Sequence, residues 1–145
     1  MPKKRSAFVD HVVETMRLLG PVEARAMFGG WGLYHGGLFF ALVAQEILYL
    51  KVDDDSRAVF QARGLDPWVY AVKDGEKSVA MSYYQAPEES LESPHLMEPW
   101  ARVAYGAALR AAARKRNKFV EAAAKKRPTR QARSIRAAKQ PRRAK

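Results

Sequence analysis

Apolar residues at the start of the sequence recur every three or four positions and predict an amphipathic helix. They are Phe8, Val9, Val12, Val13, Met16 and Leu19. Ser6 stands just before this series and can cap the helix through its hydroxyl oxygen. Gly20 and Pro21 end it, because glycine fits a left-handed residue and proline prevents continuation.

The pattern then changes to short apolar runs separated by turn residues, which predicts consecutive antiparallel strands. Residues 22–28 form the first run, and "GLYHGGLFF" is typical of a hairpin with its turn at 35–37. A second reversal is expected near Gln45–Glu46, between "LFFALVA" and "ILYLKV". In the latter run alternation places Leu48, Leu50 and Val52 on one face, and Ile47, Tyr49 and Lys51 on the other.

The rest of the pattern completes an α+β fold. A short helix is predicted from Asp53 to Arg63, with Asp53, Asp54 and Asp55 complementing its dipole and Gly64 ending it. "PWVYA" and "SVAMSYY" predict two strands joined by a turn at Lys73-Asp74-Gly75. After an acidic connector from Pro87, Pro99 is expected in the first turn of a final helix that extends to Ala124. The prediction is an antiparallel sheet flanked by an N-terminal helix and a long C-terminal helix.

Composition restricts the class of protein. The 145 residues include no cysteine, which excludes disulfides, thiolate metal sites and a cysteine nucleophile. The longest apolar run, Leu38 to Ala44, is far shorter than the roughly 20 residues that a membrane helix needs. The basic N-terminus lacks the apolar stretch of a signal peptide. We therefore expect a cytoplasmic protein without a membrane partner.

Charge is distributed unevenly along the chain. The net charge of +11 combines −2 over residues 1–110 with +13 over residues 111–145. We therefore predict a folded domain at 1–113 and a basic helical extension with a disordered tail at 114–145. Clustered cations bind nucleic acid by displacing counterions, without reading sequence. The predicted nucleic-acid-binding residues are Lys125, Lys126, Arg127, Arg130, Arg133, Arg136, Lys139, Arg142, Arg143 and Lys145. A tail that serves only solubility is the alternative.

Motifs for catalysis or cofactor binding are weak. Gly30-Trp31-Gly32 is followed by a strand pattern instead of the helix that a phosphate-binding loop requires, so hairpin geometry explains the glycines better. His11-x-x-Glu14 and His95-x-x-Glu98 each supply two potential ligands, whereas a metal site needs three or four. We expect no catalytic residue, no metal and no cofactor, and hence no enzyme.

Aromatic residues are frequent in the predicted strands, and most are expected in the core. Alternation nevertheless leaves Tyr49 and one of Tyr83 and Tyr84 on the opposite face of the sheet. Such a face can bind a partner or a helix of the same chain.

Three segments resemble the TfoX/Sxy N-terminal domain family: "RAMFGGWGLYHGGLFFALVAQEILYLKVD", "PWVY" and "MSYYQAPEESLESPHLMEPWARVAYGAALRAA". The sequence is identified as a single-domain member with a basic C-terminal tail. The family-motif residues are Met27, Phe28, Gly29, Gly30, Gly32, Tyr49, Lys51, Pro67, Trp68, Tyr70, Tyr83 and Tyr84. The resemblance implies an α+β domain, a regulatory role linked to bacterial competence, and the cyclic-AMP receptor protein as a possible partner.

We therefore expect a transcription-associated accessory protein whose tail contacts nucleic acid. A protein-interaction module without DNA binding is the first alternative, and a small-ligand binder or enzyme is the second. The sequence does not determine the oligomeric state.

Overall fold

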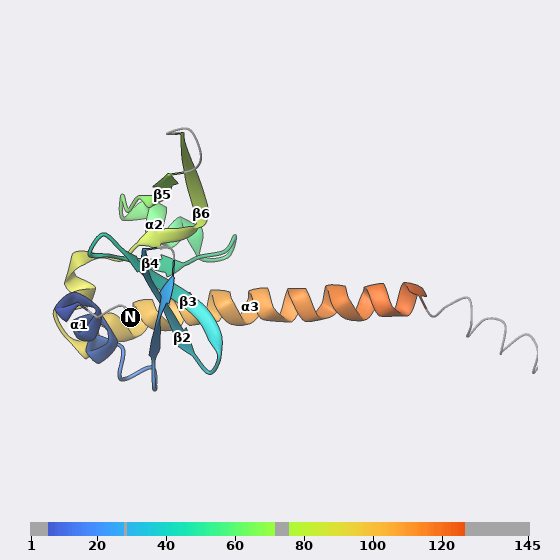
Figure 1. The fold of residues 1–145 in the computed structure, drawn as a ribbon, viewed down its shortest axis with the longest axis horizontal. Helices are drawn as coiled ribbons and strands as arrows, with labels where there is room; N and C mark the ends of the chain where they lie inside the picture. The colour runs from blue at the N-terminus through green and yellow to red at the C-terminus, as the bar shows by residue number, and fades with distance from the viewer. Residues whose placement is uncertain (1–5, 28, 72–75, 127–145) are drawn as a thin grey trace, which may run out of the picture. The chain divides into compact units, whose positions relative to one another are not determined.

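The computed structural model describes residues 6–27, 29–71 and 76–126, and it confirms an α+β fold. Its elements in chain order are α1 (Ala7–Thr15), β1 (Glu23–Met27), β2 (Gly30–His35), β3 (Leu38–Ala44), β4 (Ile47–Lys51), α2 (Arg57–Ala62), β5 (Pro67–Ala71), β6 (Lys77–Gln85), the 3₁₀ helix η2 (Glu88–Leu91) and α3 (Pro94–Lys126) (Figure 1). The chain divides into two compact units, Met1–Ala111 and Ala112–Lys145. The sheet lies in the first unit, and α3 contributes residues to both.

The six strands form one antiparallel sheet in the order β1-β2-β3-β4-β6-β5. The predicted turn at 35–37 is confirmed, since Gly36 and Gly37 have φ angles of 56° and 79° between β2 and β3. The second reversal is also confirmed, although neither residue is glycine: Gln45 and Glu46 have φ angles of 53° and 62°. The turn predicted at Lys73–Gly75 lies outside the described residues.

The core lies between one face of the sheet and the helices of the first unit. Both the sheet and the helical segments supply large buried side chains, and the alanines of α3 allow close packing. The principal core residues are Val9, Val12, Met16, Leu33, Phe40, Leu48, Leu50, Phe60, Tyr84, Met97, Ala101 and Ala104. Leu48, Leu50 and Val52 are all buried, as alternation along β4 predicts.

The first helix is capped as predicted but is shorter than its apolar pattern. The Ser6 hydroxyl oxygen accepts a hydrogen bond from the Val9 amide at 3.2 Å. The helix ends at Thr15 instead of continuing to Gly20. The Leu19 amide donates to the Met16 carbonyl at 2.9 Å, so the segment closes with tighter three-residue turns that still bury Met16.

The prediction that the three aspartates begin the second helix is wrong. α2 begins at Arg57, and its first turn contains no acidic residue. The Asp53 carboxylate instead accepts hydrogen bonds from the Asp55 and Ser56 amides, both at 3.1 Å, which folds residues 53–56 into a turn. It also accepts bonds from Arg110 of α3, from Nε at 2.6 Å and from Nη2 at 3.0 Å.

The prediction that Pro99 lies in the first turn of the last helix is also wrong. α3 begins at Pro94, and Pro99 lies inside it. The Ser93 hydroxyl oxygen accepts a hydrogen bond from the Leu96 amide at 3.2 Å and caps the helix, so Pro94 takes the first-turn position that suits proline. The helix extends to Lys126, close to the predicted end at Ala124.

Candidate functional site

The face of the sheet opposite the core carries six aromatic residues, which we call the aromatic face. They are Tyr34, Phe39, Tyr49, Trp68, Tyr70 and Tyr83, and each is partly buried. Strand register places them there: Tyr34 pairs with Phe39, and Lys51 pairs with Tyr83. The neighbouring pair of Leu50 and Tyr84 points into the core, because successive side chains alternate between faces.

The six rings form a continuous series across five strands. Ring centroids are 5.3 Å apart between Tyr34 and Phe39, and 5.6 Å apart between Phe39 and Tyr83. The series continues from Tyr83 to Trp68 at 6.4 Å, and the Trp68 ring lies 5.0 Å from Tyr70. Tyr49 joins the series 6.1 Å from Trp68. These separations lie in the range where aromatic rings attract one another.

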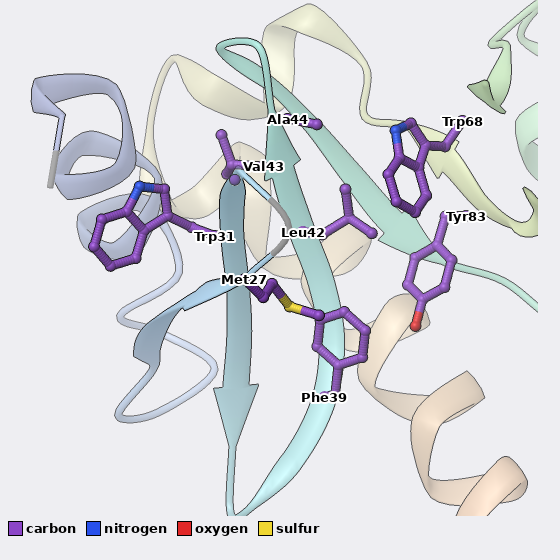
Figure 2. A pocket seen from close by; sticks show the side chains of 9 residues that line it. Met27, Trp31, Phe39, Leu42, Val43, Ala44, Trp68 and Tyr83 are labelled. Carbon is purple, nitrogen blue, oxygen red and sulfur yellow. The ribbon is translucent and has the colours of Figure 1, made fainter. Parts of the chain in front are cut away.

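Two adjoining hollows open beside these rings and share Ala44 and Trp68. The smaller has a volume of about 180 Å³ and an almost wholly apolar lining. Figure 2 shows Met27, Phe39, Leu42, Trp68 and Tyr83 around this hollow, while Trp31 points away from them. The larger, of about 650 Å³, is bordered by Tyr49 and Tyr70.

Two glycines of β2, near the smaller hollow, allow neighbouring groups to pack closely against the strand. A Cβ atom added at Gly30 would clash with the Val43 carbonyl oxygen, so no side chain fits there. A Cβ atom added at Gly32 would clash with the Met27 sulfur and come within 3.0 Å of the Phe39 ring. The glycines therefore allow close packing of the Val43 backbone and the Met27 and Phe39 side chains against β2, which agrees with the expected structural role.

Cations lie over two of the rings. The Arg25 guanidinium carbon is 4.4 Å from the Tyr34 ring centroid, and the Lys51 ammonium is 5.0 Å from that of Tyr83. Both distances allow cation–π attraction. Arg25 also forms an exposed ion pair with Glu23 at 3.0 Å, which lowers the pKa of the Glu23 carboxyl.

Two phenols of this face, those of Tyr49 and Tyr83, have raised pKa values. Burial raises the pKa of Tyr83 to about 12, and the Tyr34 phenol adds to this shift. Burial also raises the pKa of Tyr49, with a further contribution from the Asp66 carboxylate. The face therefore combines aromatic surface with the charges of Arg25, Lys51 and the exposed Glu23 that pairs with Arg25.

One histidine of the two His-x-x-Glu pairs makes a contact within the fold. His11 Nε2 lies 2.6 Å from the Leu91 carbonyl oxygen, so that ring makes a contact between α1 and η2. Within the parts of the chain that the structure describes, no group of three His, Cys, Asp or Glu residues could hold a metal ion. The aromatic face and its hollows are instead suited to binding flat or apolar groups.

The predicted nucleic-acid-binding residues fall beyond what the structure describes in atomic detail. Eight of the ten, Arg127 to Lys145, lie outside the described residues, and the side chains of Lys125 and Lys126 do as well. The preceding part of α3 places Arg114, Lys115, Arg116 and Lys118 in solvent.

Most family-motif residues border the aromatic face, while Tyr84 lies in the core and Phe28 lies outside the described residues. Those at the face or its hollows are Met27, Gly29, Gly30, Gly32, Tyr49, Lys51, Trp68, Tyr70 and Tyr83. Pro67 begins β5, an edge strand of the sheet.

Sequence reasoning correctly placed Tyr49 and one of Tyr83 and Tyr84 on this face, but it missed the other four rings. Trp68 and Tyr70 are two residues apart, and this spacing shows that they share a face without showing which one. The alternation is further obscured by two shifts of strand register, one between Leu33 and Tyr34 and one between Pro67 and Trp68.

The model of the TfoX N-terminal domain family matches residues 14–108 of the chain. None of the curated proteins matches the chain with significance. No helix among the described residues combines the length and the apolar character that crossing a membrane requires.

Proposed function

The chain belongs to the TfoX N-terminal domain family, and on this premise we propose that it is a transcription-associated accessory protein with a basic region that contacts nucleic acid. We define the basic region as residues 111–145. Its charge of +13, beside −2 for the rest of the chain, is the observation that carries the proposal. The cyclic-AMP receptor protein is the proposed protein partner, by resemblance to the competence regulators of the family.

The described part of the basic region supports a contact with phosphates. Arg114, Lys115, Arg116 and Lys118 are all exposed on α3, with Glu121 as the acid of this segment. Cations that follow one another so closely point in several directions around a helix, so they form no single groove-reading face. Binding is therefore expected to follow phosphate charge and to be indifferent to base sequence.

The test compares the full chain with a chain ending at Ala124, on unrelated DNA duplexes across a salt series. The affinity of the full chain should fall linearly with the logarithm of salt concentration, and shortening should weaken binding to every duplex alike. The Arg133→Gln variant should reduce the salt slope by about one unit if Arg133 meets one phosphate.

The matched control is Arg17→Gln, which removes an exposed cation in the turn after α1 that pairs with Glu14. It should leave duplex binding unchanged. Equal, salt-insensitive binding by the full and shortened chains would reject the basic region as the DNA contact.

A protein-interaction module is the second candidate. Val69 and Val79 pair directly across β5 and β6 and are about half exposed, as is Met81 nearby. Exposed apolar side chains that cluster in this way are typical of docking surfaces. Co-purification of a partner that the variants Val69→Ser and Val79→Ser lose would favour this candidate.

A further inference from the structure

The aromatic face has the composition of a stacking platform. Neighbouring rings have centroids 5.0 to 6.4 Å apart, and all six rings come from strands. Adjacent rings are tilted by 35° to 43° in four of the five contacts, so they form an uneven surface with hollows between the rings. Such a surface can receive flat groups that insert or stack one after another.

The charges on this face restrict the kind of ligand. Arg25 and Lys51 lie over Tyr34 and Tyr83, which places cations directly against the aromatic surface. A phosphate at Arg25 would share or replace its exposed ion pair with Glu23. A ligand that fits must present flat rings to the hollows and negative charge to these cations. A single strand of nucleic acid does both, because its unstacked bases are flat and its phosphates are regularly spaced.

We propose that the aromatic face binds single-stranded nucleic acid, with bases stacking on Phe39 and Trp68 and phosphates meeting Arg25 and Lys51. In a duplex the bases are stacked inside the helix and cannot reach these rings. The lining of the smaller hollow is almost wholly apolar, so it offers few groups to hydrogen-bond a base edge, and binding should tolerate many sequences.

This site is distinct from the basic region, and the inference rests on the rings and cations of β1 to β6. The proposed function names nucleic acid as the ligand, and binding at the aromatic face extends this ligand to single strands. The experiment below compares single-strand binding among variants that all retain residues 111–145. A failure of duplex binding would therefore count against the basic region and not against the aromatic face.

The experiment uses the full chain and two dye-labelled probes, an oligothymidylate of about 12 nucleotides and a mixed-sequence duplex of similar length. Fluorescence anisotropy is measured at a salt concentration that weakens duplex binding. Trp68→Leu and Phe39→Leu keep an apolar side chain but remove the ring. Each should lower the affinity for the single strand about 5- to 100-fold and leave the duplex affinity unchanged.

The matched control is Trp100→Leu. Trp100 is also a partly buried tryptophan beneath a cation, Arg63 at 5.4 Å, but it packs against Phe60 of α2 on the helical side of the sheet. This variant should bind both probes like the unchanged protein. Thermal unfolding of each variant shows whether it is folded.

Lys51→Gln provides a second measurement if a ring variant does not fold. It should reduce the salt slope of single-strand binding by about 0.7, the value for one phosphate contact on a single strand. Unchanged single-strand affinity in folded ring variants, or an unchanged slope in Lys51→Gln, would overturn the proposal. Absence of single-strand binding, or a protein partner that the ring variants lose instead, would overturn it as well.

Discussion

Asp53 is a buried carboxylate whose partners come from its own turn and from α3. Besides Arg110 and the two backbone amides, the Ser56 hydroxyl donates to Asp53 Oδ1 at 3.1 Å. Arg110 contributes most to holding the pKa of Asp53 at about 2, and Ser56 contributes less. Because the folded pKa lies below the unfolded value, the ionised carboxylate stabilises the folded state above about pH 4.

Replacing Asp53 by Asn should therefore destabilise the protein in a pH-dependent way. At pH 7 the free energy of unfolding should fall by about 1–2 kcal/mol, a modest value because the Arg110 side chain is 43% exposed and solvent screens the pair. The difference from the unchanged protein should shrink as pH falls from about 4 to 2. Denaturant unfolding at pH 7, 4 and 2 measures this dependence.

The control for this substitution is Asp54→Asn. Asp54 pairs with Arg57 at 2.8 Å, but its side chain is 89% exposed, so the change should cost no more than about 0.5 kcal/mol. An effect of Asp53→Asn that is equally large at pH 7 and pH 2 would show that its charge is unimportant.

At the scale of elements, the β2–β3 and β3–β4 turns of the sheet contain different residues in similar backbone conformations. Gly36 and Gly37 join β2 to β3, whereas Gln45 and Glu46 join β3 to β4, and all four have positive φ angles. A residue with a side chain is less stable in this conformation, by about 1–2 kcal/mol. The β3–β4 turn therefore carries backbone strain that the neighbouring strands maintain.

Introducing the favoured turn sequence should relieve this strain. The double substitution Gln45→Asn and Glu46→Gly should raise the free energy of unfolding by about 1 kcal/mol, because Asn-Gly suits a two-residue turn with positive φ angles. Thermal unfolding measures the change.

The reciprocal control is Gly37→Ala, where an added Cβ atom meets no atom within 4 Å but the φ angle is 79°. Its free energy of unfolding should fall by about 1 kcal/mol from the backbone conformation alone. A double variant in the β3–β4 turn that is less stable than the original would contradict the argument.

At the scale of the whole molecule, the buried apolar residues lie in the first unit, while the positive charge lies largely in the basic region. The hydrophobic core draws on residues 9–108, and every described side chain from residue 113 to residue 122 is exposed. Phe119, for example, is 76% exposed. A segment without buried apolar contacts opens easily and offers little resistance to proteases.

Limited proteolysis should therefore remove the basic region and leave a resistant core. Trypsin should trim the chain back toward residues 113–127, and mass spectrometry should identify the remaining fragment. Arg63 and Arg102, which lie in the first unit, are internal control sites that should be cut much more slowly. Independent folding of residues 1–113 would be contradicted if Arg63 or Arg102 were cut as fast as Lys115. Global unfolding of a chain shortened at Arg127 would contradict it as well.

Local interactions made much of the fold predictable from the sequence. Alternation of side chains along a strand requires only neighbouring residues, so β4 and its buried positions followed from the apolar pattern. Hairpins join adjacent strands through short turns, which explains why the reversals at 35–37 and 45–46 were found correctly. The charge of the basic region also follows from composition alone. Its contact with nucleic acid is still a prediction.

Contacts between distant residues decided the rest. Arg110 and Asp53 are 57 positions apart, and the turn around Asp53 that moves the start of α2 to Arg57 was not visible in the local pattern. The aromatic face likewise depends on β6 lying between β4 and β5, which brings Tyr83 beside Lys51 and Trp68. Strand order and register determine which rings meet, because alternation specifies two faces and only tertiary packing selects the one that the helices cover.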